Sequence, residues 1–178
     1  MITIETIENL NYLLAVGGLV TILATLILIF DFRTKRVLQA CIQTWGLLVA
    51  FVGVLGSTIL SLIYSEVFGF IPCGLCWLER IALYPQVLLI GVALYFKDRL
   101  MPRYGIVLSI FGLIISLYHH YIQMGGSQFV KCPAAGAGAD CAKRFFFEFD
   151  FMTFPLAVAI FFAFLITLYI YLLKTRAD

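Results

Sequence analysis

The sequence predicts an all-α integral membrane protein. Of its 178 residues, 63% are apolar and only 12% are charged, whereas a soluble domain is about half apolar and about a quarter charged. The charges fall in short clusters between long apolar runs. Each run must be helical in lipid, because backbone groups there have no water to bond. The formal net charge of +2 is too small to indicate a nucleic-acid partner, so membrane lipid is the expected surrounding.

Five apolar runs are each long enough to cross a bilayer, which takes roughly 20 residues. They are about Leu10–Phe30, Leu38–Tyr64, Leu78–Phe96, Tyr104–Tyr121 and Met152–Leu173. Glu79 and Arg80 lie near the outer end of the third run. The first run follows Glu5 and Glu8 rather than basic residues, so we interpret it as a transmembrane helix and not as a signal peptide.

The distribution of lysine and arginine predicts the orientation, because cytoplasmic connections carry an excess of these residues. With five crossings, one face of the membrane receives Arg33, Lys35, Arg36, Lys97, Arg99, Arg103, Lys174 and Arg176. The opposite face receives only Lys131, Lys143 and Arg144. We therefore expect the N-terminus outside and the C-terminus in the cytoplasm.

The fourth connection, residues 122–151, is long and has an unusual composition. Its Gly/Ala segment, residues 134–139, predicts a flexible arm with little core of its own. Five of the seven residues from Phe145 to Phe151 are phenylalanine. They indicate either an aromatic belt at the membrane boundary or a segment that anchors the arm beside a reaction site.

Two cysteine pairs carry the predicted chemistry, and both are expected on the non-cytoplasmic face. Cys73 and Cys76 form a CGLC motif that follows Pro72 and opens the third helix. The dipole and free N–H groups of a helix N-terminus favour a thiolate, which is the species that attacks in disulfide exchange. Cys41 stands alone near the cytoplasmic end of the second helix, and we interpret it as an inert apolar residue.

The second pair, Cys132 and Cys141, lies within the long connection, with eight residues between them. A disulfide that closes so short a loop stabilises by about 2–3 kcal/mol at most, which adds little to a helical bundle. One interpretation is a structural disulfide. We favour an exchangeable disulfide on a mobile arm, which can meet both an outside partner and the CGLC pair.

Three polar residues near the CGLC motif are candidates for binding an electron acceptor. Arg80 lies four residues after Cys76 and shares its helix face, so its cation can stabilise a thiolate or an anion on a bound acceptor. Alternatively, Arg80 extends to the interface or pairs with Glu79. His119 and His120 end the fourth helix on the non-cytoplasmic side of the membrane, where either can be a tolerated polar residue, or can bind a quinone oxygen or shuttle its proton.

These motifs resemble the disulfide bond formation protein B (DsbB) family of thiol:quinone oxidoreductases. The resemblance covers roughly Leu55 to Leu173. It rests on PCGLCWLER from Pro72, YHHYIQ from Tyr118, CAKR from Cys141 and Phe154-Pro155 at the last helix. It implies a four-helix transmembrane bundle over residues 38–178, with a redox loop at 122–151. Residues 1–37 would then be an extra N-terminal transmembrane helix with a basic cytoplasmic loop.

The resemblance also implies a role for each cysteine. Cys132 is the sulfur that a reduced, thioredoxin-fold (DsbA-like) dithiol oxidase attacks. Cys141 passes the electrons on through a transient bridge to Cys73. Cys76 is the sulfur nearest the quinone.

The remaining implied roles concern the acceptor and the cell compartment. Arg80 and, more weakly, His120 would bind the quinone, either ubiquinone or menaquinone from the membrane pool, and no metal is implied. The expected location is the bacterial inner membrane, with both cysteine pairs on the periplasmic or extracellular side. There the protein would support disulfide formation during protein folding.

Other classes of protein predict different behaviour for the same residues. In a metal-binding protein the four outer cysteines, with a histidine, would form a zinc site, although Cys-x8-Cys is an unusual half-site. A purely structural membrane protein would hold two unreactive disulfides. Vitamin K epoxide reductase-like proteins place their loop pair before the helix-borne CxxC, whereas here Cys132 and Cys141 follow it.

Overall fold

The computed structural model of the protein describes residues 4–34, 36–129, 132 and 140–174. Its long helices are α1 (Ile4–Arg33), α2 (Gln39–Leu62), α3 (Gly74–Phe96), α4 (Met101–Gln123) and α5 (Phe154–Lys174). All five are long and apolar enough to cross a membrane. The prediction of an all-α membrane protein with five transmembrane helices is therefore confirmed.

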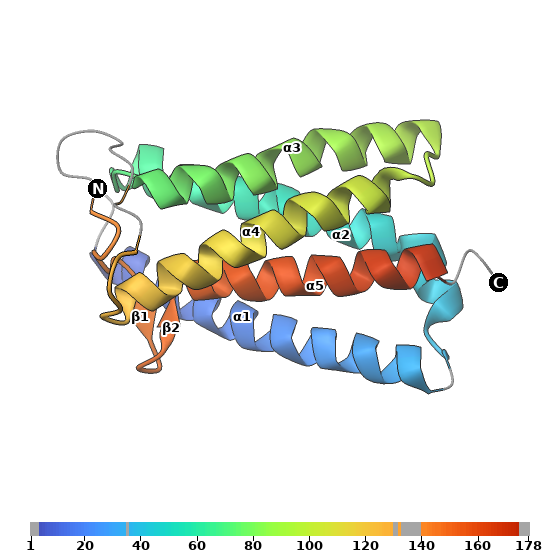
Figure 1. Ribbon diagram of the computed structural model, residues 1–178, viewed down its shortest axis with the longest axis horizontal. Helices are drawn as coiled ribbons and strands as arrows, with labels where there is room; N and C mark the ends of the chain where they lie inside the picture. Colours follow the sequence, from blue (N-terminus) through green and yellow to red (C-terminus); the bar gives the residue numbers. More distant parts are fainter. Residues whose placement is uncertain (1–3, 35, 130–131, 133–139, 175–178) are drawn as a thin grey trace.

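The helices run side by side, and the connections gather at the two ends of the bundle (Figure 1). One end, here called the cysteine end, holds the start of α3 with Cys73 and Cys76 and the described part of the α4–α5 connection. The other, here called the basic end, holds the α1–α2 and α3–α4 connections and the last turn of α5. Its described cations are Arg33, Arg36, Lys97, Arg99, Arg103 and Lys174.

Two helix boundaries at the cysteine end differ from the apolar runs. After α2 the chain continues as a π-helical turn, η1 (Ile63–Val67), which shortens the expected connection over Ser65–Pro72. Helix α3 begins at Gly74, before the apolar run that starts at Leu78, because Cys73 caps the helix there. Helical structure thus extends beyond the hydrophobic residues wherever backbone groups find local partners.

Helices α4 and α5 pack closely along their length, and two glycines make this possible. A Cβ atom at Gly112 would collide with the ring of Phe162, and one at Gly105 would collide with the ring of Tyr169. Small residues let transmembrane helices approach in this way, since packing rather than hydrophobicity drives their association in lipid.

A buried polar cluster joins α3, α4 and α5 in the middle of the bundle. Gln86 Nε2 lies 3.3 Å from Ser109 Oγ, and Tyr169 Oη donates to Gln86 Oε1 at 3.0 Å. All three side chains are fully buried. Hydrogen bonds of this kind fix the relative positions of the helices that carry the cysteine end.

The connection before α5 ends in a short hairpin, β1 (Phe147–Glu148) paired antiparallel with β2 (Met152–Thr153). Just before it, Phe146 is only 2% exposed and packs with Ala15 and Met152. At least part of the aromatic segment is therefore anchored in the bundle and is more than a surface belt. The Gly/Ala segment 134–139, predicted to be flexible, lies outside the described residues.

Candidate functional site

The CGLC motif forms the first turn of α3. Cys73 is the N-cap, with an extended backbone (φ −76°, ψ 172°), and its sulfur accepts a hydrogen bond from Cys76 N at 3.2 Å. The two sulfur atoms lie 2.8 Å apart, within hydrogen-bonding distance. The motif therefore sits at the positive end of the helix dipole, as predicted.

This environment favours the thiolate of Cys73. The pKa of the Cys73 thiol falls to about 4, chiefly through its hydrogen bond with Cys76 and further through His119, although burial opposes the shift. An unperturbed thiol has a pKa of about 8.5. Cys73 is therefore suited to act as a nucleophile, and equally as a leaving group, in disulfide exchange.

The second cysteine pair lies against the first. Cys132 and Cys141 form a disulfide, whereas Cys73 and Cys76 are free thiols. The sulfur atoms of Cys73, Cys132 and Cys141 all lie within 4.8 Å of one another. The structure thus brings together the two pairs that the sequence places far apart, at a separation from which a small movement would allow exchange.

Two side chains at the end of α4 hold the described part of the loop in this place. His119 Nε2 lies 3.2 Å from the carbonyl oxygen of Cys141. Gln123 Nε2 donates to the carbonyl oxygen of Lys143 at 3.2 Å. The position of Cys141 is therefore set by the backbone of its own loop, which is bound to the same helix end that faces Cys73.

A buried carboxylate, imidazole and thiol form a chain across the site. His119 Nδ1 lies 2.9 Å from Glu79 Oε1, and His119 Nε2 lies 3.6 Å from Cys73 Sγ. His119 is 2% exposed and Glu79 is 9% exposed. The carboxylate orients the ring, so that the other ring nitrogen faces the sulfur. This is the arrangement by which a histidine exchanges a proton with a cysteine.

The sequence made His119 a candidate but did not predict its contacts with Glu79 and Cys73, although one signal was present. Glu79 lies in a helix that crosses the membrane, and a buried carboxylate there requires a partner. We considered Arg80 as that partner, whereas the structure pairs Glu79 with His119 from the neighbouring helix. The pairing depends on how α3 and α4 pack, which the sequence does not reveal.

His120, which the resemblance favoured over His119, faces another part of the molecule. Its Nδ1 lies 2.8 Å from Thr153 Oγ1 at the start of α5. His119 lines the cavity described below, and His120 is not among the lining residues. The structure therefore groups His119 with Cys76 and Arg80, and does not group His120 with them.

Arg80 is held by α2 at the wall of a cavity. Its Nε and Nη2 donate at 3.0 Å to the hydroxyl and carbonyl oxygens of Ser61. Its guanidinium also lies over the ring of Trp77, 5.3 Å from the centroid. Arg80 is thus fixed without a carboxylate partner among the described residues, and its positive charge is available to a ligand.

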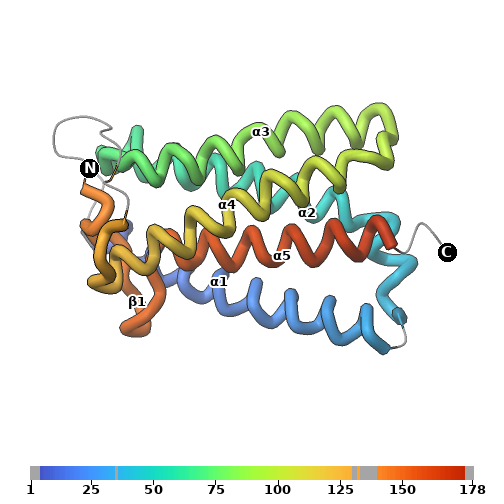
Figure 2. The backbone as a smooth tube through the Cα atoms, in the orientation of Figure 1, coloured from blue at the N-terminus to red at the C-terminus, as the bar shows by residue number. Residues whose placement is uncertain are grey.

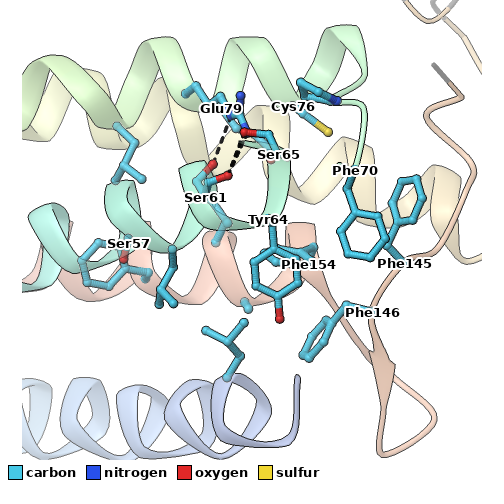
Figure 3. A pocket seen from close by; sticks show the side chains of 18 of the residues that line it. Ser57, Ser61, Tyr64, Ser65, Phe70, Cys76, Glu79, Phe145, Phe146 and Phe154 are labelled. Carbon is cyan, nitrogen blue, oxygen red and sulfur yellow. Dashed lines mark hydrogen bonds between the residues drawn. The ribbon is translucent and has the colours of Figure 1, made fainter. Parts of the chain in front are cut away.

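The cavity has a volume of about 540 Å³, within the range of small-molecule binding sites. At one end it is lined by Cys73, Cys76, Glu79, Arg80 and His119, and its remaining wall is mainly apolar. Aromatic side chains from three segments, including Tyr64, Phe146 and Phe154, surround the part shown in Figure 3. A flat, largely apolar molecule with polar edges would fit these surroundings.

The positions of Cys73, Cys76 and His119 are also relevant to the alternative of a zinc site. The ligand atoms of Cys73, Cys76 and His119 lie within 4.8 Å of one another. A site with all four outer cysteines would require the disulfide between Cys132 and Cys141 to be reduced, because thiolates are the metal ligands.

Cys41 is separate from this chemistry. It is an exposed residue in the first turn of α2, at the basic end of the bundle. The other four cysteines lie at the cysteine end.

The chain is similar in sequence to known proteins of disulfide bond formation. The family described as disulfide bond formation protein DsbB matches residues 43–173. A probable disulfide formation protein C of Bacillus cereus is 37% identical over 69% of this chain and 84% of its own length. Disulfide bond formation protein C of Bacillus subtilis is 36% identical over 71% of this chain and 87% of its own length. No solved structure matches the chain significantly.

The match covers α3, α4, α5 and most of α2, and it includes all four cysteines of the site. Only α1 and the start of α2 lie outside it. The chain therefore belongs to the DsbB family of membrane proteins, and its role is in disulfide bond formation.

Proposed function

We propose that the protein is a thiol:quinone oxidoreductase of the bacterial cytoplasmic membrane. It reoxidises a soluble, thioredoxin-fold dithiol oxidase outside the cytoplasm and delivers the electrons to the quinone pool. One observation carries the proposal. Cys73 lies within 4.8 Å of the sulfur atoms of the Cys132–Cys141 disulfide, while its partner Cys76 lines a cavity together with Arg80.

The first step is exchange between the soluble partner and the loop disulfide. A thiolate of the reduced partner attacks Cys132, and Cys141 leaves as a thiolate. The second partner thiolate then releases Cys132. The partner gains a disulfide, and two electrons with two protons remain on Cys132 and Cys141, so the exchange balances.

The second step moves these electrons to the CGLC pair. The thiolate of Cys141 attacks Cys73 in an oxidised Cys73–Cys76 pair, and Cys76 leaves as a thiolate. Cys132 then attacks Cys141, which restores the loop disulfide and releases Cys73 as a thiolate.

The residues around the cavity fit a quinone as the acceptor. Arg80 would bind a ring oxygen, Cys76 would lie beside the ring, and the apolar wall would exclude water. When bound, a quinone accepts two electrons and two protons. The cation of Arg80 would stabilise negative charge on the acceptor, since its hydrogen bonds to Ser61 hold it in place before any charge develops.

His119 would exchange protons with the CGLC pair. Reoxidation of the CGLC pair releases its protons, and His119 Nε2, 3.6 Å from Cys73 Sγ, is positioned to exchange a proton with that sulfur. Glu79 would stabilise the resulting imidazolium from the other side. Residues Glu79 and His119 both line the cavity, so a proton taken up here is held next to the acceptor.

The orientation follows from the charges of the bundle. The described cations Arg33, Arg36, Lys97, Arg99, Arg103 and Lys174 lie at the basic end. We therefore assign that end to the cytoplasm and the cysteine end to the oxidising compartment.

Quinone reduction by the purified protein tests the proposal, with a reduced thioredoxin-fold oxidase as electron donor. We expect turnover in the wild type, its loss in Cys76→Ser and Cys132→Ser, and full turnover in the matched control Cys41→Ser. Disulfides that resist exchange and a wild type without turnover would indicate a structural role. Stoichiometric zinc bound to reduced protein would indicate the metal site.

A further inference from the structure

Helix α1 lies outside the region that matches the family, yet it is built into the bundle. It packs along α5, as Figure 2 shows. At the cysteine end Tyr64 Oη donates to Asn11 Oδ1 at 2.6 Å, and at the basic end Tyr171 Oη donates to Asp31 Oδ2 at 2.6 Å. Because both ends are held by buried hydrogen bonds, the position of α1 is fixed relative to α2 and α5.

The position of α1 leaves space between it and α2. The cavity that begins at Arg80 and Cys76 continues between these helices, where α5 forms the third wall. Its lining there is apolar or small, and includes Leu14, Gly17, Val52, Gly56, Val158 and Phe161. A Cβ atom added at Gly17 or Gly56 would meet no other described side chain within 4 Å.

The cavity also reaches the outer surface of the bundle. Leu13 of α1 and Val52 of α2 line it, although they are 65% and 61% exposed. In a membrane these exposed surfaces face the acyl chains. The cavity therefore has one polar, enclosed end beside the cysteines and one apolar end that opens to lipid.

An unsatisfied polar atom marks the enclosed end as a ligand site. Gln123 lines the cavity and is 6% exposed, and its Oε1 has no hydrogen-bond partner among the described residues. A buried acceptor without a partner is costly. A bound molecule with a hydroxyl group, such as the reduced form of a quinone, would satisfy it.

We propose that α1 forms one wall of a channel for the isoprenoid tail of the quinone. This inference rests on the proposed function and extends it, because it gives α1, which lies outside the family match, a part in binding the quinone tail. The ring would occupy the polar end beside Arg80, and the tail would run between Gly17 of α1 and Gly56 of α2 toward the lipid. The extra helix thereby becomes part of the binding site.

Equilibrium binding of tailed and tail-less quinones tests the channel without measuring turnover. Trp77 stacks on Arg80, and in a Trp45→Phe background it is the sole tryptophan. Quenching of its fluorescence would give the affinity for menaquinone and for menadione, which has the same ring without the tail. Ubiquinone and its tail-less ring serve as a second pair.

Two variants, Gly17→Leu and Gly56→Leu, add bulk inside the channel, at positions where a Cβ atom meets no other described side chain within 4 Å. Their matched controls are Val20→Phe on α1 and Val49→Phe on α2, which add similar bulk on lipid-facing positions outside the cavity lining. We expect each glycine variant to weaken binding of the tailed quinone by about tenfold or more, because contacts with the tail are lost. Binding of the tail-less ring, and all binding by the controls, should stay within about twofold.

The other outcomes distinguish failure of the channel from failure of the proposed function. Equal affinity of the wild type for tailed and tail-less quinones would overturn the channel and leave the proposed function intact, with lipid acyl chains in the groove. Glycine variants that bind both forms normally would have the same meaning. A wild type that binds no quinone of either pair would overturn the proposed function itself.

Discussion

Asp31 at the basic end and Glu79 at the cysteine end are both buried carboxylates, with exposed fractions of 8% and 9%. Asp31 accepts hydrogen bonds from the hydroxyl of Tyr171 and from the backbone N–H of Leu38. These donors are fixed parts of the fold. Their geometry ties α1 to the start of α2 and to α5, so Asp31 has a structural role.

Glu79 is bound instead to a titratable group. Its partner His119 contacts the sulfur of Cys73, and all three residues line the cavity. The comparison teaches that burial of a carboxylate does not by itself indicate function. The partner of the carboxylate determines whether its role is structural or chemical. Only a partner that exchanges a proton with a neighbouring reactive atom allows the carboxylate to influence chemistry.

The largest loss of turnover is expected when His119, the partner of Glu79 at the cysteine end, is replaced. Replacement by alanine removes the group that stabilises the Cys73 thiolate and exchanges protons with it, so turnover with quinone should fall by about 10²–10³-fold. His120→Ala is the matched control, because His120 binds Thr153 outside the cavity lining and should keep turnover within about twofold of wild type. Steady-state rates with both variants measure this difference. The opposite result would restore His120 as the functional histidine that the family resemblance favoured.

A smaller effect is expected at Arg80. Its replacement by alanine should raise the KM for quinone by roughly 10–100-fold, since a hydrogen bond to a charged group contributes about 1.5–3 kcal/mol. Exchange between the loop disulfide and a reduced partner should remain normal, because Arg80 contacts Ser61 and Trp77 and neither cysteine pair. Arg80→Lys keeps the charge and should recover part of the affinity. An unchanged KM in Arg80→Ala would remove Arg80 from acceptor binding.

The features of the fold that could be predicted depend on local sequence. Apolar runs gave the five helices, and the CGLC motif gave the start of α3, since dipole and capping act within one turn. Helix ends were less predictable. The π-helical turn after α2 extends past the apolar residues because backbone hydrogen bonds, not hydropathy, determine where a helix stops.

The site could be predicted only in part, because half of it depends on tertiary packing. Cys73, Cys76 and Arg80 are spaced three and four residues apart at the start of α3, so their position on one helix face follows from helix geometry. The approach of Cys73 to Cys132 and Cys141 requires the loop to bind His119 and Gln123. Likewise, the choice between His119 and His120 depends on the rotation of α4, which adjacent positions in the sequence do not reveal.

The comparison of the two carboxylates can be tested directly with isosteric amides. Glu79→Gln keeps a hydrogen-bond acceptor for His119 and loses the charge, so we expect turnover to fall by about tenfold. Asp31→Asn should leave turnover unchanged and lower the free energy of unfolding by about 1–3 kcal/mol. Turnover and denaturant unfolding of both variants provide the two measurements. Loss of turnover in Asp31→Asn, with stability retained, would show that the distinction between the ends is wrong.

The smallest effect concerns the thiolate of Cys73 and its pH dependence. Iodoacetamide reacts with thiolates, and in a Cys41→Ser/Cys76→Ser background Cys73 is the sole unpaired thiol when Cys132–Cys141 is oxidised. The serine hydroxyl can replace the hydrogen bond from Cys76 that chiefly lowers the pKa of Cys73. Because this pKa is lowered, the thiolate persists as the pH falls and is lost only below the neutral range.

Alkylation of Cys73 should therefore change by less than about threefold between about pH 8 and pH 6, whereas a thiol with the ordinary pKa of about 8.5 would slow by nearly a hundredfold. Adding His119→Ala to the same background removes the second stabilising contact, so the decline should begin at a higher pH. Mass spectrometry of the labelled peptide measures both rates. Identical profiles with and without His119 would mean that the helix N-terminus and the neighbouring hydroxyl suffice to hold the thiolate, and that His119 acts only after electrons reach the acceptor.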